Sequence, residues 1–206
     1  VAANQTMNYK NFHIVFNGEI YNFKEIKAEL KATGHNFNVE SDTELILHAF
    51  EEWGAKCVEK FIGMFVIVIY DTYNNQLHIF RDRAGIKPLY YYKKNNLFIF
   101  ASELKAIIKH SSVTKIINKD ALSYYFKFGN VPSPLSIYED IFKFPSGSIG
   151  TFDIDKNTFD IKEYWNVYDF YTKEASIDLD YDTAKHNVEE LLTSSILYRN
   201  IADVPI

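Results

Sequence analysis

The 206-residue sequence has one cysteine, no block of like charges and no apolar run long enough to span a bilayer. With a single cysteine the chain forms no internal disulfide, which fits a reducing compartment such as the cytoplasm. A net charge of −5 without a basic cluster argues against a nucleic-acid-binding surface. The longest apolar run, FIGMFVIVIY at residues 61–70, is shorter than the ~20 residues of a transmembrane helix and predicts a buried strand. We therefore expect neither nucleic acid nor membrane as a partner.

Histidines and cysteine show no arrangement typical of a metal centre or a nucleophile. The six histidines are His13, His35, His48, His78, His110 and His186. They are scattered, and no pair has the spacing of metal ligands, so we expect no metal. Cys57 lies in an amphipathic stretch with no neighbouring feature that would lower its thiol pKa. We expect it to serve packing, because free cysteine is among the most often buried residue types.

The apolar patterns predict an α+β fold. Hydrophobic residues make up 47% of the chain and aromatic residues 17%, which is enough for a substantial core. Strands are predicted at residues 12–16, 64–70, 77–81, 89–93 and 97–102, with a hairpin within 148–165. Helices are predicted between 22 and 34, 41 and 54, 103 and 110, 119 and 128, and 181 and 200, with a loop containing extended pieces at 129–147. Because hairpins pair antiparallel and the helices are grouped apart from them, we expect layered antiparallel sheets with helices outside.

The dipeptide Asn17-Gly18 follows the first predicted strand. Asn-Gly is a strong turn signal, but the residues after it do not alternate as in a returning strand. One interpretation is an ordinary turn. The other is a pair of hydrogen-bond donors, the Asn17 amide and the Gly18 backbone N–H, aimed at a developing oxyanion. Glycine suits that role because its backbone comes close to a ligand without a Cβ clash.

Two further segments allow both a structural and a functional interpretation. In SDTE, Ser41 and Glu44 form a capping box, and Asp42 either complements the helix dipole or pairs with a substrate ammonium group. The pattern alone favours the structural interpretation. The segment RDRAGIKPLYY, residues 81–91, reads as a strand end, a tight connection and the start of the next strand. Nothing in it alone requires catalysis.

Five segments taken together are far more specific than any one of them. In chain order they are FNGEIYN, SDTE, RDRAGIKPLYY, FASELKAI and FGNVPSPLSIYEDIFKFPSG. They resemble the glutamine-dependent asparagine synthetase family over nearly the whole chain. The resemblance implies a class II glutamine amidotransferase domain with the four-layer αββα sandwich of N-terminal-nucleophile hydrolases. It implies that Asn17 and Gly18 form the oxyanion hole, that Glu19 binds substrate in the same loop, and that Asp42 holds the α-amino group of glutamine.

The chain also departs from the family pattern. The family's nucleophile is an N-terminal cysteine whose own α-amine acts as the base, and no residue here matches it. Neither Arg81 nor Arg83 matches the family's arginine that binds the glutamine carboxylate. The resemblance therefore implies a glutaminase domain at 1–166 without its first strands, a linker at 167–180, and the first helix of an ATP-dependent α/β synthetase domain at 181–206. We expect these 206 residues alone not to hydrolyse glutamine.

For the intact protein the resemblance implies hydrolysis of glutamine to glutamate and ammonia, and ATP-dependent amidation of aspartate. ATP and Mg²⁺ would bind outside this chain, and a homodimer is a candidate assembly. One alternative keeps the fold but amidates another carboxylate, such as a sugar acid of a surface polysaccharide. Another is a domain without a nucleophile that serves in binding or assembly. A cysteine directly after the initiator methionine would favour the enzyme.

Overall fold

The computed structural model describes residues 6–172 and 179–200. The strands are β1 (Met7–Tyr9), β2 (Phe12–Ile20), β3 (Gly63–Asp71), β4 (Gln76–Arg81), β5 (Tyr90–Lys94), β6 (Leu97–Ala101), β7 (Ile141–Lys143), β8 (Ser148–Asp153) and β9 (Thr158–Glu163). The helices are α1 (Phe23–Ala32), α2 (Asp42–Trp53), the short 3-10 helix η1 (Gly54–Lys56), α3 (Cys57–Lys60), α4 (Leu104–Ile107), α5 (Lys119–Phe128), α6 (Tyr168–Thr172) and α7 (Tyr181–Arg199). This order confirms the predicted α+β class.

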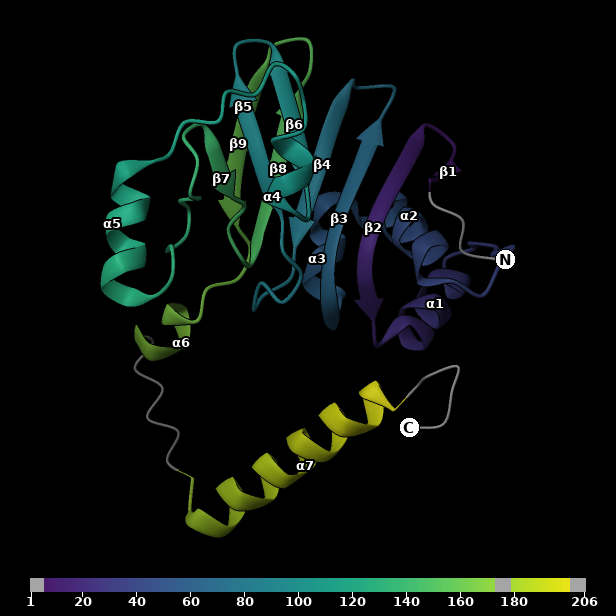
Figure 1. Cartoon of the computed structure of the whole chain (residues 1–206). Helices are drawn as coiled ribbons and strands as arrows, with labels where there is room; N and C mark the ends of the chain where they lie inside the picture. Colours follow the sequence, from purple (N-terminus) through teal and green to yellow (C-terminus); the bar gives the residue numbers. More distant parts are fainter. Residues whose placement is uncertain (1–5, 173–178, 201–206) are drawn as a thin grey trace.

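Two antiparallel sheets form the centre of the molecule (Figure 1). The large sheet has the strand order β1-β2-β3-β4-β8-β9, and the small sheet has the order β6-β5-β7. Figure 1 shows the small sheet stacked on the large one, with α1, α2 and α3 on the far face of the large sheet and α4 over the small sheet. The described residues thus form helix, sheet, sheet and helix layers, as the sequence predicted.

Strand β3 contributes to the cores on both sides of the large sheet. Phe65, Ile67 and Ile69 face α1, α2 and α3 and join the core under these helices. Val66 and Val68 point the opposite way and join the core between the two sheets. This alternation follows from the two-residue period of a strand, and it explains why β3 is apolar throughout. The prediction of a strand buried on both faces is confirmed.

Aromatic side chains fill most of the space between the sheets. Phe98 of the small sheet stacks on Phe152 of the large sheet with ring centroids 4.4 Å apart. Phe159 meets both Phe98 and Tyr91 in edge-to-face contacts. Such contacts supply large buried areas with few rotatable bonds, which helps to fix how the two sheets are stacked. A third core lies on the outer face of the small sheet, where Ile107 of α4 is buried.

Several boundaries differ from the sequence-based predictions. Strand β2 continues through Asn17 and Gly18 to Ile20, so this dipeptide is part of a strand and not a turn. Strand β1, strand β7 and helix α6 were not predicted as elements; each is five residues or shorter, too short for a clear periodic pattern. Asn22 precedes α1, but its side chain does not cap that helix. It donates to the carbonyl of Lys60 and accepts from the N–H of Ile62, so it joins α1 to the chain leading into β3.

Helix α7 lies apart from the sandwich, with its last turn near α1 (Figure 1). The Tyr198 hydroxyl donates to Glu25 of α1 over 2.8 Å, and the Arg199 guanidinium lies over the Tyr21 ring. Four apolar residues of α7 are each more than half exposed: Val188, Leu191, Leu192 and Ile196. The assignment of residues 181–206 to a second domain stays a prediction. Within the described ranges, no helix combines the length and the apolar character needed to cross a membrane.

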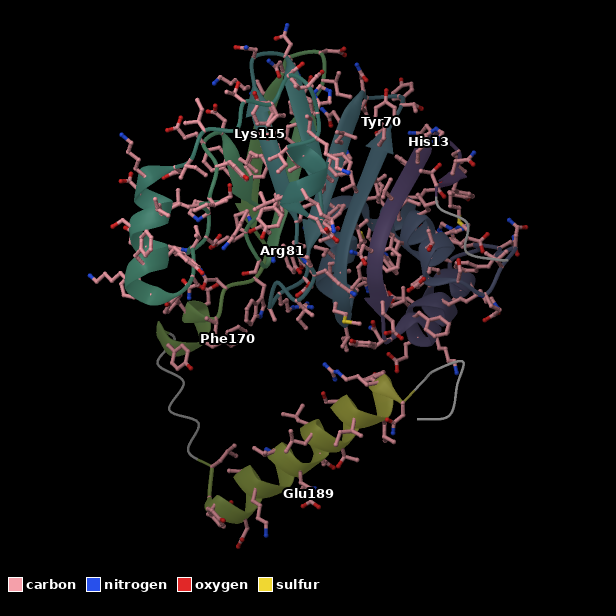
Figure 2. The ribbon with its side chains drawn as sticks, in the orientation of Figure 1. His13, Tyr70, Arg81, Lys115, Phe170 and Glu189 are labelled. Carbon is pink, nitrogen blue, oxygen red and sulfur yellow. The ribbon has the colours of Figure 1, made fainter. Side chains whose placement is uncertain are left out.

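A buried carboxylate organises the connection after β4. Asp82 is 1% exposed and accepts hydrogen bonds from the backbone N–H groups of Phe65, Ile86 and Lys87. Its own N–H donates to the Phe65 carbonyl, so one residue ties the connection to β3. The Arg81 guanidinium, at the end of β4 in Figure 2, donates to the carbonyls of Lys87 and Gly85. The segment is thus a structural connection, in line with its structural interpretation from the sequence.

We expect Asp82→Ala to lower the free energy of unfolding by about 3 kcal/mol or more, because it leaves three backbone donors without their charged acceptor. Urea denaturation of the 206-residue chain measures this loss. Asp160→Ala, which removes an exposed carboxylate from β9, is the matched control and should change stability by less than ~0.5 kcal/mol. Equal effects of the two substitutions would show that the Asp82 hydrogen bonds do not hold this connection.

Candidate active site

The end of β2 and the beginning of α2 meet at Asp42. Burial raises the pKa of the Asp42 carboxyl, the backbone N–H groups of Ile20 and Thr43 oppose this rise, and the charge of Glu19 adds to it. The Asp42 carboxylate, at the start of α2, therefore lies beside Ile20, the last residue of β2.

The loop before α2 fixes the position of Asp42. Ser41 caps the helix by accepting the N–H of Glu44 over 3.3 Å. The Glu44 side chain does not complete a capping box; it accepts the backbone N–H groups of Asn38 and Val39, each at 2.9 Å. Asp42 is then the first residue of the helix, where the exposed N–H groups favour a negative charge.

Gly18 lies where β2 and β3 come very close. It is opposite Phe65 in the antiparallel register, and its φ is 155°. A Cβ added at Gly18 would lie 2.1 Å from the carbonyl oxygen of Met64 and 2.6 Å from the Cα of Phe65. Both are backbone atoms of β3, so neither could move aside as a flexible side chain would. Glycine is therefore a steric requirement at this position.

The side chain of Asn17 is exposed next to the small sheet. Asn17 is opposite Val66 in the register, and Val66 belongs to the core between the sheets, so both side chains are on that face. The side-chain amide nitrogen of Asn17 donates to the Ser102 hydroxyl over 3.3 Å. Ser102 directly follows β6 in the segment FASELKAI, and it was not among the predicted site residues. Its position after a strand in one of the five family-like segments was the available signal.

Cys57 and the two arginines of the connection after β4 are not available as a nucleophile or an anion-binding pair. Cys57 is 1% exposed within the core under the helices, and burial raises the pKa of its thiol. Arg83 donates to the carbonyls of Phe61 and Glu59, and Arg81 is likewise bonded to carbonyls. The predicted packing role of Cys57 is confirmed.

The histidines are less scattered in space than in sequence. The fold places His35 and His48 so that their Nδ1 atoms are 2.9 Å apart, although they are separated by 13 residues in the sequence. The reason for expecting no metal, the absence of a suitable pair, is therefore wrong for these two residues. The expectation of no metal rested on sequence spacing alone.

Comparison with known proteins places the chain in a family. Residues 1–165 match the family model described as a glutamine amidotransferase domain. The chain belongs to this family. A Methanocaldococcus jannaschii protein provisionally named asparagine synthetase [glutamine-hydrolyzing] 2 is 38% identical over 202 residues, which cover 94% of this chain and 36% of that protein. Asparagine synthetase [glutamine-hydrolyzing] 3 of Bacillus subtilis is 34% identical, covering 95% of this chain and 31% of its own length.

The chain thus spans about a third of the length of these relatives. Among solved structures, glutamine phosphoribosylpyrophosphate amidotransferase from Bacillus subtilis superposes with a TM-score of 0.53 at 15% identity, covering 77% of this chain and 31% of that one. At this identity the likeness concerns the fold alone. It supports the predicted sandwich of antiparallel sheets.

We expect the Cys57 thiol to react with iodoacetamide at least ~100-fold more slowly in the folded chain than in urea, because reaction requires local opening and ionisation of a buried thiol. Mass spectrometry of the alkylated protein over time measures both rates. Similar rates in the two states would contradict the buried position of Cys57.

Proposed function

We propose that this domain hydrolyses glutamine to glutamate and ammonia. The observation that carries the proposal is the geometry of β2, which holds the exposed Asn17 amide and the sterically required Gly18 and ends beside Asp42, the first residue of α2. The Asp42 carboxylate would pair with the α-ammonium group of an amino acid. Asn17 would then direct its side-chain amide toward the carbonyl group that reacts. The relatives, whose names describe glutamine-hydrolysing enzymes, support glutamine as that amino acid.

Each residue has a separate proposed role. Asp42, together with Glu19, binds the α-ammonium group of glutamine by charge-assisted hydrogen bonds. Asn17 donates its side-chain amide, and Gly18 its backbone N–H, to the oxyanion that forms when a nucleophile attacks the side-chain amide carbon. Collapse of that intermediate releases the amide nitrogen as ammonia, and water then releases glutamate. Ser102 positions the Asn17 amide through the hydrogen bond between them.

The attacking group is proposed to be a cysteine outside these 206 residues, as the family resemblance implies. Cys57 does not qualify, because it is buried and burial raises the pKa of its thiol. For the same reason we propose that the chain alone does not hydrolyse glutamine. In a longer protein of the relatives' kind, the ammonia would amidate aspartate, and the ATP and Mg²⁺ that this step needs would bind outside the amidotransferase domain.

In a full-length protein that carries the nucleophile, Asn17→Ala should lower glutamine-dependent turnover by ~100-fold or more, the usual effect of losing one oxyanion donor. Synthesis with added ammonium should keep its rate, because it bypasses glutamine hydrolysis. Steady-state assays with each nitrogen source measure both. Asn36→Ala, an exposed asparagine between α1 and α2, is the matched control. Equal loss of both activities would instead indicate a structural role for Asn17.

We expect Asp42→Asn to raise the KM for glutamine by ~10-fold or more, because a neutral amide replaces the charge that binds the ammonium group. Burial raises the pKa of Asp42 above its ordinary value of 3.8. As the pH is lowered, the carboxylate should therefore become protonated, and the wild-type KM should begin to rise before pH 3.8 is reached. The variant should lack this pH dependence. Asp120→Asn, in the first turn of α5, is the matched control. An unchanged KM in Asp42→Asn would exclude Asp42 from ammonium binding.

A further inference from the structure

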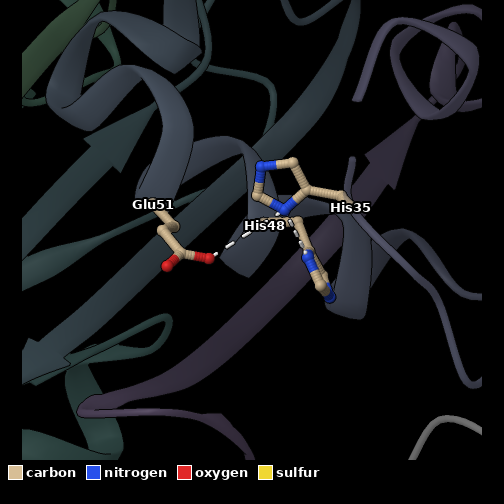
Figure 3. Close-up of side chains that lie close together, drawn as sticks. All are labelled: His35, His48 and Glu51. Atoms are coloured by element: carbon tan, nitrogen blue, oxygen red, sulfur yellow. Dashed lines mark hydrogen bonds and ion pairs between the residues drawn. The ribbon is translucent and has the colours of Figure 1, made fainter. Parts of the chain in front are cut away.

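A cluster of two histidines and a glutamate lies further along α2 than Asp42. His35 follows the end of α1, and His48 and Glu51 are one turn apart on α2 (Figure 3). The two Nδ1 atoms are 2.9 Å apart, and His35 Nδ1 is 3.9 Å from Glu51 Oε2. One donor atom from each of the three residues lies within 4.8 Å of the others.

The cluster is shielded but reachable. His48 is 1% exposed, and the rings of Tyr9 and Phe37 lie 4.1 and 4.5 Å from its ring. On the outer side, His35 and Glu51 line an open pocket. Glu51 uses its Oε1 to pair with Lys10, which leaves Oε2 turned toward the histidines. A small ion could therefore enter from solvent while most of the cluster stays packed.

Two buried polar atoms of the cluster have no hydrogen-bond partner among the described residues. Glu52 Oε2 accepts from His35 Nε2 over 3.0 Å, which puts the proton on Nε2 and leaves Nδ1 of His35 as an acceptor. His48 Nδ1 must then donate, and its Nε2 is left without a proton. Among the described residues that Nε2 has no hydrogen-bond partner, and it lies 4.0 Å from the Glu44 carboxylate. The buried Glu51 Oε2 has none either.

A cation between the three donor atoms would give each of these polar atoms a partner. Both Nδ1 atoms would offer lone pairs to the ion, and Glu51 Oε2 would become a ligand. His48 Nε2 would then carry a proton facing Glu44, just as His35 Nε2 faces Glu52. Histidine ligands held by a carboxylate on the second ring nitrogen are the usual arrangement at protein zinc sites.

We propose that His35, His48 and Glu51 form a binding site for a divalent transition-metal ion of the zinc class. Two imidazoles and one carboxylate suit Zn²⁺, Co²⁺ or Ni²⁺, whereas Mg²⁺ and Ca²⁺ prefer oxygen ligands. The fourth position faces the open pocket and is available to water. Glu44 and Glu52 are the residues that orient the two rings.

The geometry needs small adjustments to accept the ion. In a tetrahedral site with bonds of about 2.0–2.1 Å, donor atoms lie about 3.3 Å from one another. The two Nδ1 atoms at 2.9 Å would separate slightly, and Glu51 Oε2, at 3.9 Å from His35 Nδ1, would move closer. His35 and Glu51 border the pocket, so their side chains have room to make these movements.

Titration of the 206-residue chain with Zn²⁺ against a chromogenic chelator tests the site. We expect one ion per chain with a Kd tighter than about 10 μM. His35→Gln and Glu51→Gln should each weaken binding by ~10-fold or more, while Glu52→Gln, which removes a ring-orienting group, should weaken it less. His110→Gln, which changes an exposed histidine in the bend after α4, is the matched control and should bind as wild type.

A second measurement requires no substitution. In long-range ¹H–¹⁵N spectra of the wild-type chain, one equivalent of Zn²⁺ should shift the ring signals of two of the six histidines, through their Nδ1 atoms, and Mg²⁺ should shift none. Wild-type binding weaker than about 10 μM would overturn the proposal. Equal losses of Zn²⁺ affinity in His35→Gln and His110→Gln would also overturn it, as would ring shifts spread over all histidines. The cluster would then be a hydrogen-bonded histidine pair.

Discussion

The double burial of β3 is the constraint on which the rest of this domain depends. A strand that is apolar on both faces must be covered on both, and here three helices cover one face and a second sheet covers the other. Burial of this kind is the main favourable contribution to folding, at roughly 25 cal/mol for each Å² of apolar surface removed from water. The layered arrangement follows from this one strand.

The candidate active site is built along the edge of β3 that faces β2. Asn17 and Gly18 are held by pairing with Val66 and Phe65, so the proposed oxyanion donors are fixed by the strand ladder between β2 and β3. Rigid strands hold catalytic groups more accurately than loops do. The N–H of Phe65 also bonds to Asp82, which connects the same part of β3 to the chain after β4. Placement of the site is thus inseparable from the stability of the sheet.

The sequence contained enough information to predict the element types and the layers, because β3 is a short run of apolar residues and α2 has apolar residues at helical spacing. It was misleading at Asn17-Gly18, where a turn dipeptide lies inside a strand. The local pattern could not show that β3 approaches so closely that glycine is required there for steric reasons. Strands β1 and β7 were missed because strand pairing, and not composition, determines them.

Within the candidate site, the roles expected for Glu19 and Asp42 were implied by family resemblance and not by spacing. The contact of Ser102 with Asn17 and the pairing of His35 with His48 were not predicted. Both join residues far apart in sequence, across 85 and 13 positions, and periodicity carries no information about such contacts. They depend on how α1, α2 and the two sheets pack.

The order of strands in the large sheet has a consequence for how the chain folds. Strand β4 pairs with β8, and the whole small sheet, together with α4 and α5, lies between these two strands in sequence. The small sheet is therefore an insertion between two neighbouring strands. Contacts of such long sequence separation form late, because the closure entropy of the intervening loop must be overcome first. During synthesis, β1 to β4 and their helices can assemble early, while β4 keeps an open edge until β8 emerges from the ribosome.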